Sequence, residues 1–322
     1  MTERTYDGSL AGLFSILDEV WAAAASGAAP ALPDHIRRIS PVQAAGERSV
    51  PPGPSGQGDL FGENGGPQPE ACFDVSARSG APFPSGSALT DGPESAPTGS
   101  ARDLYAVSAD AFDAFAAAWM SELPIEAEIV RFGFKTLAAA RWAAAQKTAH
   151  TPRRAAGKSA PADWTACEEA RLGAARQAHD RGDADVRAVL AAAYKAAHEI
   201  DRMRGFLRFS PNEDGVYVAR CAPDHFVLPA LAFHFTRRFG EQAWAIIDEK
   251  RGLCLSRNPG EEPRLFDLLS EPLPADNDPW TALWRHYHRT INNESRKNPQ
   301  LQRQFMPERY WKYLPELNTK TV

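Results

Sequence analysis

The chain has 322 residues, a formal net charge of −5 and an apolar content of 43%, including 8 Trp and 16 Phe. A chain of this size and composition can bury a hydrophobic core, as one large domain or two small ones. The acidic balance argues against a non-specific nucleic-acid coat but leaves room for a local basic patch. No run of about 18 apolar residues is present, which excludes an ordinary membrane-spanning helix.

The cysteines indicate the compartment. Cys72, Cys167, Cys221 and Cys254 are far apart and form no CxxC pair, which is typical of free thiols in a reducing cytoplasm. The N-terminal residues MTERTYDGSL lack the basic start and apolar run of a secretory signal. We therefore expect a cytoplasmic protein that has no membrane partner.

The first predicted element is a helix within TYDGSLAGLFSILDEVWAA, with Asp7 or Ser9 as its cap. Its apolar residues recur at helical spacing and form one stripe: Leu10, Leu13, Phe14, Leu17, Val20 and Trp21. We expect residues 1–40 to form an N-terminal strand and helix that pack on the main domain. Residues 41–101, rich in Pro, Gly and Ser, contain no apolar periodicity and are predicted to be a disordered insertion.

Residues 102–322 are predicted to form the main α+β domain. Four helices come first, in SADAFDAFAAAWMSEL, PIEAEIVRFGFKTLAAARWAAAQK, DWTACEEARLGAARQAHDRG and DADVRAVLAAAYKAAHEIDRMRG, the last ending at Gly205. FLRFS and VYVARC are then strand-like, and WAIIDEKRGLCLSR is typical of a hairpin that bends near Lys250. Helices ending at Gly240 and within DPWTALWRHYHRTINNESR and NPQLQRQF complete a mostly helical fold with a small antiparallel sheet in the middle of the chain.

The stretch HEIDRMRGFLRF combines cations with aromatic rings. His198 and Arg202 are four residues apart and share a helix face. Arg204, Phe206 and Arg208 follow across the predicted helix–strand junction, where Phe206 and Arg208 are expected to point the same way. Such a face can hold phosphates and stack on bases. The alternative is a structural ion-pair cluster, for which Glu199, Asp201, Asp248 and Glu249 are available partners.

The stretch CAPDHFVLPALAFHFTRRFG contains Cys221, His225 and His234. A fourth ligand is missing and the spacing matches no zinc site, so no metal is predicted. His234, Arg237 and Arg238 lie near the end of the predicted helix, where they suit its dipole or could face an anion.

The C-terminal run from Trp280 to Tyr313 is basic inside an acidic chain. Its basic residues are Arg285, Arg289, Arg296, Lys297, Arg303, Arg309 and Lys312, against Glu294 and Glu308. An apolar stripe is expected to be buried: Trp280, Leu283, Trp284, Tyr287 and Ile291. Tyr310, Trp311 and Tyr313 follow as either core residues or rings that stack on bases.

No motif names a reaction. The sequence contains no Walker loop, GxGxxG, GxSxG, CxxxCxxC or zinc-deaminase signature, so no cofactor is predicted. Asp248 and Arg251 flank the hairpin tip, where Asp248 is either a general acid/base or, without a nearby nucleophile, a turn stabiliser. The candidate acid/base set is His198, His225, His234 and Asp248.

Four stretches occur in order: TYDGSLAGLFSILDEVW, HEIDRMRGFLRF, PDHFVLPALAFHFTRRF and NPQLQRQFMPERYWKYLPE. In this combination the chain resembles a bacterial family of domains of unknown function, whose members are described as DNA-metabolism or DNA-repair proteins. The resemblance implies a DNA context, because members are encoded beside a radical-SAM protein of DNA repair and some are fused to a uracil-DNA-glycosylase-like domain. It implies no established activity, and the insertion at residues 41–101 departs from the family pattern.

Three functions stay open. The leading hypothesis is a DNA-binding accessory to a radical-SAM DNA-repair enzyme. The residues expected to contact DNA are Arg202, Arg204, Phe206, Arg208, Arg237, Arg238, Arg251, Arg289, Arg296, Lys297, Arg309, Tyr310, Trp311 and Lys312. The alternatives are an enzyme that acts on damaged DNA bases and a scaffold whose basic face docks an acidic partner.

Overall fold

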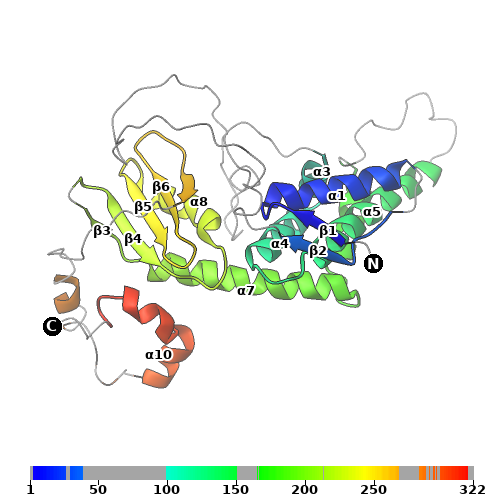
Figure 1. Ribbon diagram of the computed structural model, residues 1–322. Coiled ribbons are helices and arrows are strands. Elements are labelled where there is room, and N and C mark those ends of the chain that lie inside the picture. The colour runs from blue at the N-terminus through cyan, green and yellow to red at the C-terminus, as the bar shows by residue number, and fades with distance from the viewer. Residues whose placement is uncertain are drawn as a thin grey trace.

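The computed structural model describes residues 3–26, 30–38, 99–150, 165, 167–212, 214–267, 283–287, 290, 293, 295 and 298–317. These residues form an α+β structure that is mostly helical, as the sequence predicts. A layer of helices lies at one end and a five-stranded sheet at the other, and the long helix α7 (Ala184–Phe206) runs beneath both (Figure 1).

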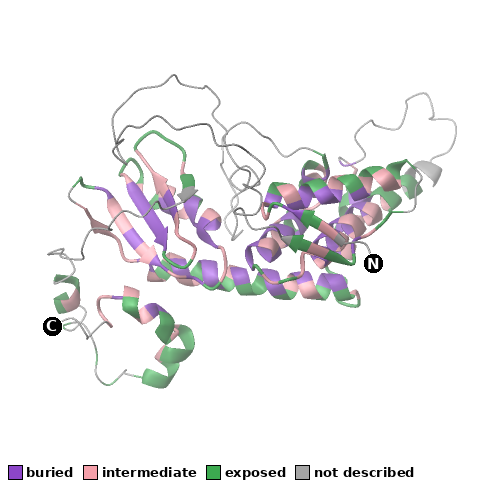
Figure 2. Cartoon of the chain, in the orientation of Figure 1, coloured by how far each residue is buried: buried purple, intermediate pink, exposed green. Residues whose placement is uncertain are grey.

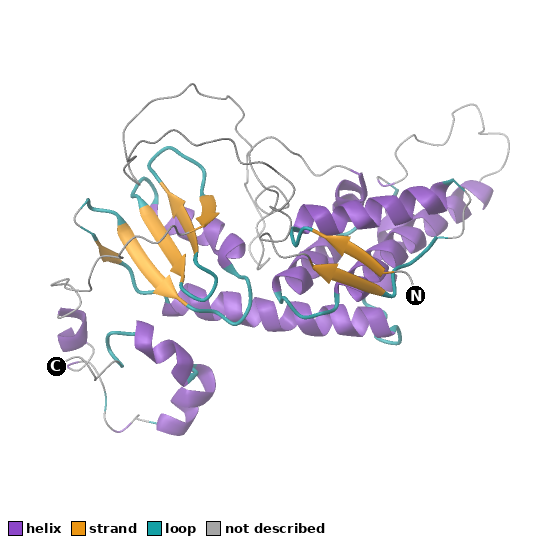
Figure 3. Cartoon of the chain, viewed as in Figure 1, coloured by secondary structure: helices purple, strands orange, loops and turns teal. Residues whose placement is uncertain are grey.

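The helical layer is built mainly from the N-terminal half of the chain. Its described helices besides α7 are α1 (Leu10–Ala25), α3 (Gly99–Val107), α4 (Ala109–Met120), α5 (Glu126–His150) and α6 (Glu168–Ala178). A parallel pair of strands, β1 (Glu3–Tyr6) and β2 (His35–Arg38), lies beside these helices (Figure 3). None of the helices in the described ranges is long and apolar enough to cross a membrane.

Polar side chains cap the starts of three helices. Ser9, one of the two expected caps of α1, accepts a hydrogen bond from the Gly12 backbone N–H at 2.9 Å. Ser108 caps α4 through the Ala111 N–H at 3.1 Å, and Asp183 caps α7. Each cap satisfies an amide that has no partner in the first helical turn.

The helical layer encloses a core of aromatic and aliphatic side chains, which we call the helical core. Phe14 of α1 stacks on Phe115 of α4 with ring centroids 4.4 Å apart, and Phe115 is fully buried. Gly133 lets α5 approach this pair, because a Cβ there would lie only 2.9 Å from the Leu17 side chain. The predicted N-terminal helix is therefore an integral part of the layer, not a loose extension.

One carboxyl group in this layer makes stability depend on pH. Burial, together with the nearby Asp110, raises the pKa of Asp113 from 3.8 to about 7. Between about pH 4 and pH 7 the folded protein keeps this proton, whereas the unfolded chain has released it. The contribution of Asp113 to the free energy of unfolding therefore falls as pH rises through this range. Three pKa units correspond to about 4 kcal/mol. Solvent screening of this partly exposed group reduces the expected value to about 1–2 kcal/mol.

Asp113→Asn, which stays uncharged, is therefore expected to raise the free energy of unfolding by about 1–2 kcal/mol at pH 8. The gain should shrink when the same urea titrations are run at pH 5.5, because wild-type Asp113 is then mostly protonated. An equal gain at both pH values would show that the effect comes from the amide itself and not from ionisation.

The five-stranded sheet follows the order β3 (Ser210–Pro211), β4 (Tyr217–Cys221), β5 (Trp244–Asp248), β6 (Leu253–Arg257) and β7 (Arg264–Asp267). β5 and β6 form the predicted antiparallel hairpin. β4 and β5 are parallel and are connected through helix α8 (Leu228–Phe239), so the sheet is mixed and not purely antiparallel. Two parallel strands need such a crossover, because the chain must return to the end of the sheet where the first strand began, and a tight turn is too short for that.

The junction after α7 differs from the sequence prediction. The helix continues to Phe206, so Gly205 lies inside it, and the following strand is only Ser210–Pro211. The Leu207 N–H still donates to the Met203 carbonyl at 3.2 Å, and buried Leu207 holds the end of the helix against the sheet. The expectation that Phe206 and Arg208 lie on a strand and point the same way is therefore wrong.

A second core, which we call the sheet core, lies between the sheet, α8 and the C-terminal half of α7. Trp244 and Phe235 are fully buried there, whereas the C-terminal helix α10 shows mostly exposed residues (Figure 2). Met120 at the end of α4 also packs in the sheet core, and its carbonyl accepts the Phe226 N–H at 2.9 Å. The helical layer and the sheet are thus joined by α7 and by the end of α4.

Two further predictions need correction. Helix α3 begins at Gly99, so the last three residues of the expected insertion are helical, and the remaining residues 41–98 lie outside the described part. Ser100 is held there by its N–H and hydroxyl, which donate to Asp18 at 2.6 and 2.5 Å. Helix α3 was missed in the sequence because its apolar residues are few.

The stripe expected to be buried before α10 is exposed where it is described. Leu283, Trp284 and Tyr287 are 56%, 39% and 51% exposed, and Trp280 and Ile291 lie outside the described residues. Trp284 instead donates its indole N–H to Glu316 at 3.0 Å and lies under the Arg208 guanidinium. These rings therefore line a polar surface contact and not a core.

Candidate functional site

The C-terminal segment lies against the sheet core. Asn298 caps α10 (Pro299–Phe305), and the 3₁₀ helix η5 (Glu308–Tyr313) follows. Tyr310 is 1% exposed and Leu314 is fully buried, so η5 is anchored and not loosely attached. This places Arg309, beside Tyr310, next to the exposed face of α7.

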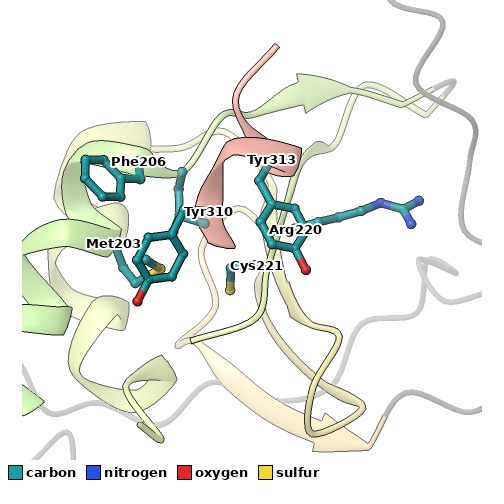
Figure 4. Close-up of a pocket in the computed structure, with 7 residues that line it drawn as sticks. Met203, Phe206, Arg220, Cys221, Tyr310 and Tyr313 are labelled. Carbon is teal, nitrogen blue, oxygen red and sulfur yellow. The ribbon is translucent and has the colours of Figure 1, made fainter. Parts of the chain in front are cut away.

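Tyr310 and Tyr313 descend from η5 on either side of Cys221, and the Arg220 side chain extends away from them (Figure 4). The cavity between these side chains has a volume of only about 10 Å³, roughly enough for one water molecule. Burial raises the pKa of the Cys221 thiol, which keeps it protonated and poorly nucleophilic. This cavity is therefore a packing feature and not a ligand site.

Glu199 of α7 is the buried anchor of this region, with 2% exposure. Its two carboxylate oxygens accept the backbone N–H groups of Asp224 at 2.8 Å and His225 at 2.7 Å. The Tyr310 hydroxyl also donates to Glu199, and burial beside this carboxylate raises the pKa of Tyr310, so the hydroxyl remains a donor. One carboxylate thus connects α7, the loop before α8, and η5.

Above Glu199 lies an open groove with a volume of about 320 Å³. Residues from three segments line it: Tyr194, Lys195, His198, Glu199, Arg202, His225 and Arg309. Three permanent cations face one carboxylate there, so the groove favours an anionic ligand. Lys195 and Arg202 form no ion pair with any residue of the described part, whereas Arg309 contacts Asp224 at 2.7 Å.

His225 is oriented from two sides. Its Nδ1 lies 2.8 Å from the Ser121 carbonyl oxygen, which can only accept, so Nδ1 carries the proton. Its backbone N–H is held by Glu199. In the neutral ring Nε2 is then the basic nitrogen, which can accept a proton or a hydrogen bond.

Tyr194 stands at the exposed side of the groove and is 66% exposed. The His198 ring contacts it edge to face, with centroids 4.2 Å apart and an interplanar angle of 72°. The two residues are one helical turn apart on α7, so the helix itself fixes this arrangement.

Comparison with known families covers the part of the chain that builds this groove. Residues 169–316 match the model of a family of domains of unknown function, DUF4130. The match to the DUF4130 model includes all seven residues that line the groove. No curated protein and no solved structure matches the chain.

The structure brings together four predicted site residues from distant parts of the sequence. His198, Arg202, His225 and Arg309 all line the groove. Sequence reasoning missed Tyr194 and Lys195. A signal was present, because Lys195, His198 and Arg202 recur at helical spacing on the polar face of α7.

Four of the six other predicted cations that the structure describes face carboxylates. Arg208 pairs with Glu316 at 2.7 Å and Arg204 with Asp201 at 3.1 Å. Lys312 contacts Glu249 at 3.4 Å, the carboxylate that also accepts the Tyr313 hydroxyl at 2.6 Å.

Arg251 is held between two elements and does not face the groove. It pairs with Asp248 at 2.8 Å and with Glu122 of the α4–α5 connection. It also donates to the Asp224 carbonyl at 3.0 Å. These contacts tie the hairpin tip to the helical layer, which is a structural role.

Two candidate acid/base residues lie in surroundings that do not suit that role. Asp248 is fully buried and accepts the N–H groups of Lys250 at 3.0 Å and Arg251 at 3.3 Å, so it stabilises the hairpin turn. Burial, with Arg204 and Arg238 nearby, lowers the pKa of His234, which does not line the groove.

The remaining candidates are dispersed. Tyr310 is buried and presents no open ring face to a base, and Phe206 packs against it with centroids 5.7 Å apart. Trp311 is partly exposed and donates its indole N–H to the Met306 carbonyl at 2.8 Å. Arg237 and Arg238 are exposed at the end of α8. Arg289, Arg296 and Lys297 lie outside the residues whose side chains are described.

Among the residues that the structure describes, no group of three or more His, Cys, Asp or Glu side chains could hold a metal ion. The chemistry that the groove does offer is anion binding by fixed cations, together with two imidazoles.

Proposed function

We propose that the protein binds DNA through the α7 groove and acts in DNA metabolism as an accessory to a radical-SAM DNA-repair enzyme. The supporting observation is the convergence of Lys195, Arg202 and Arg309 around one groove in an acidic protein. Lys195 and Arg202, which have no ion-pair partner among the described residues, are available to neutralise phosphates and release counterions.

The DNA context and the enzyme partner rest on the family resemblance stated from the sequence. The groove adds a physical reason for nucleic acid, because the paired cations Arg208, Arg251 and Lys312 are less available than Lys195 and Arg202.

Reversing two charges on α7, in Lys195→Glu/Arg202→Glu, is expected to weaken DNA binding by about tenfold or more. Two phosphate contacts are lost and two repulsive charges replace them. Fluorescence anisotropy with a labelled 20-nucleotide DNA strand measures the effect. For wild type, log K plotted against log salt should have a slope of about −2, as three neutralised phosphates on a single strand predict.

Arg171→Glu/Arg176→Glu provides a matched control, because both residues are exposed on α6 and lie outside the groove. It changes the net charge by the same amount and should leave affinity within about twofold. Equal losses in both double variants would show that only overall charge matters. Absence of DNA binding by wild type, with a partner retained after nuclease treatment, would favour the protein scaffold.

A second candidate is an enzyme that acts on DNA bases, favoured by the orientation of His225. Because its Nδ1–H is fixed on the Ser121 carbonyl, Nε2 could serve as a general base in the groove. Denaturing electrophoresis and mass analysis of the incubated DNA test this candidate. A product that forms with wild type and is lost in His225→Gln would establish it.

A further inference from the structure

From the groove's size and its exposed ring we infer a substrate class: the groove holds one nucleotide of single-stranded DNA, with the base stacked on Tyr194. This inference rests on the proposed function and adds strand selectivity to it. The shared chemistry is an unstacked base joined to a phosphate.

The first argument is the state of the Tyr194 ring. It is 66% exposed, and among the described residues its ring contact is the edge-to-face contact with His198. Most other aromatic rings of this region pack into the sheet core or against polar partners, as Tyr310 and Phe206 do. An exposed ring supported from one side can accept a base, because every base has a π-face.

The second argument is the arrangement of charge along α7. Tyr194, His198 and Arg202 are spaced four residues apart, so they form one row on the helix surface. Tyr194 and Arg202 are separated by about 12 Å along the helix axis, at 1.5 Å per residue. Lys195 and Arg309 line the same groove beside this row. The row therefore offers a stacking position at one end and phosphate partners at the other.

The third argument is size. A volume of about 320 Å³ lies at the lower end of the range for small-molecule sites and cannot enclose a double helix. In a duplex both faces of each base are covered by neighbouring bases, so Tyr194 could not reach one. Only an unpaired strand, or a free nucleotide, presents both the ring face and the phosphate that this groove can contact.

Fluorescence anisotropy with a 20-nucleotide oligothymidylate and with a duplex of equal length tests the inference. Wild type should bind the single strand at least about tenfold more tightly than the duplex. Tyr194→Ala should weaken single-strand binding about 5- to 150-fold, the range for loss of one stacked base, and should leave duplex binding within about twofold. Tyr194→Phe keeps the ring and should retain affinity within about threefold.

Trp142→Ala serves as the matched control, because Trp142 is also 66% exposed but lies on α5, outside the groove. It should leave single-strand affinity unchanged. Equal affinity for strand and duplex, or an unaffected Tyr194→Ala, would overturn the inference. If binding still depended on Lys195 and Arg202, the proposed DNA binding would survive that result.

Competition with thymidine monophosphate shows whether the groove binds a DNA strand or a free nucleotide. A strand bound through several phosphates should resist displacement by millimolar nucleotide. Complete displacement by the nucleotide, with no preference for the strand, would assign the groove to a free nucleotide and contradict the inference. Failure of wild type to bind any DNA would overturn the proposed function as well.

Discussion

Glu199→Ala is expected to lower the free energy of unfolding by about 3–5 kcal/mol. The carboxylate is 2% exposed and accepts from the Asp224 and His225 N–H groups and from the Tyr310 hydroxyl. Its removal leaves the buried Tyr310 hydroxyl and two partly buried N–H groups without their acceptor, which costs more than the net value of the hydrogen bonds. Urea unfolding at pH 7, followed by circular dichroism, measures the change.

Two further variants test whether the loss of stability comes from the buried carboxylate of Glu199. Asp201→Ala, on the same helix but with a 64% exposed side chain, should change stability by no more than about 1 kcal/mol. Tyr310→Phe removes one donor and leaves the carboxylate two amide partners, so a loss of about 1–2 kcal/mol is expected. A loss below about 1 kcal/mol for Glu199→Ala would contradict the assignment of Glu199 as the anchor of η5.

Gly173→Ala is the second substitution with a large expected effect, a loss of about 1–3 kcal/mol. Gly173 lies on α6 where it meets α5, and a Cβ there would be 2.7 Å from the Ala139 carbonyl oxygen and 2.8 Å from the Ala143 Cβ. Backbone cannot rotate aside as a long side chain can, so the two helices must separate. Thermal and urea unfolding of the variant measure the cost.

Gly205→Ala is the matched control for this substitution. Gly205 also lies in a helix, but a Cβ there meets nothing within 4 Å. Alanine should then stabilise the protein by up to about 1 kcal/mol through its helix propensity, less near the end of the helix. The two glycine variants should therefore change stability in opposite directions. A stabilised Gly173→Ala would show that α5 and α6 adjust without cost.

Much of the fold could be predicted from sequence because local signals were strong. Ser108, Gly240 and the tip at Lys250 mark element ends that the structure confirms. The parallel pairing of β4 with β5 could not be read locally, since it depends on α8 crossing over the sheet. The end of α7 was misplaced because glycine is a common helix terminator, whereas buried packing of Leu207 extends this helix past Gly205.

The candidate site was predictable only in part. Residue type and spacing identified Arg202 and Arg309 as cations beside aromatic rings, but sequence could not show that they share a groove. It also could not distinguish available from neutralised arginines. Arg208 and Arg251 appear equivalent to Arg202 along the chain, yet carboxylates more than 100 residues away in sequence pair with them.

The sharing of α7 between both cores has a consequence for how the protein can be divided. Val186 and Val189 belong to the helical core, and Ile200 and Met203 belong to the sheet core. All four lie on one continuous helix, α7. Unfolding of either part would expose buried α7 residues of the other part to water. We therefore expect the described part of the protein to unfold as one cooperative unit. A fragment trimmed to residues 169–316 would also leave behind Met120 and Ser121, and with them the carbonyl that aims the His225 ring.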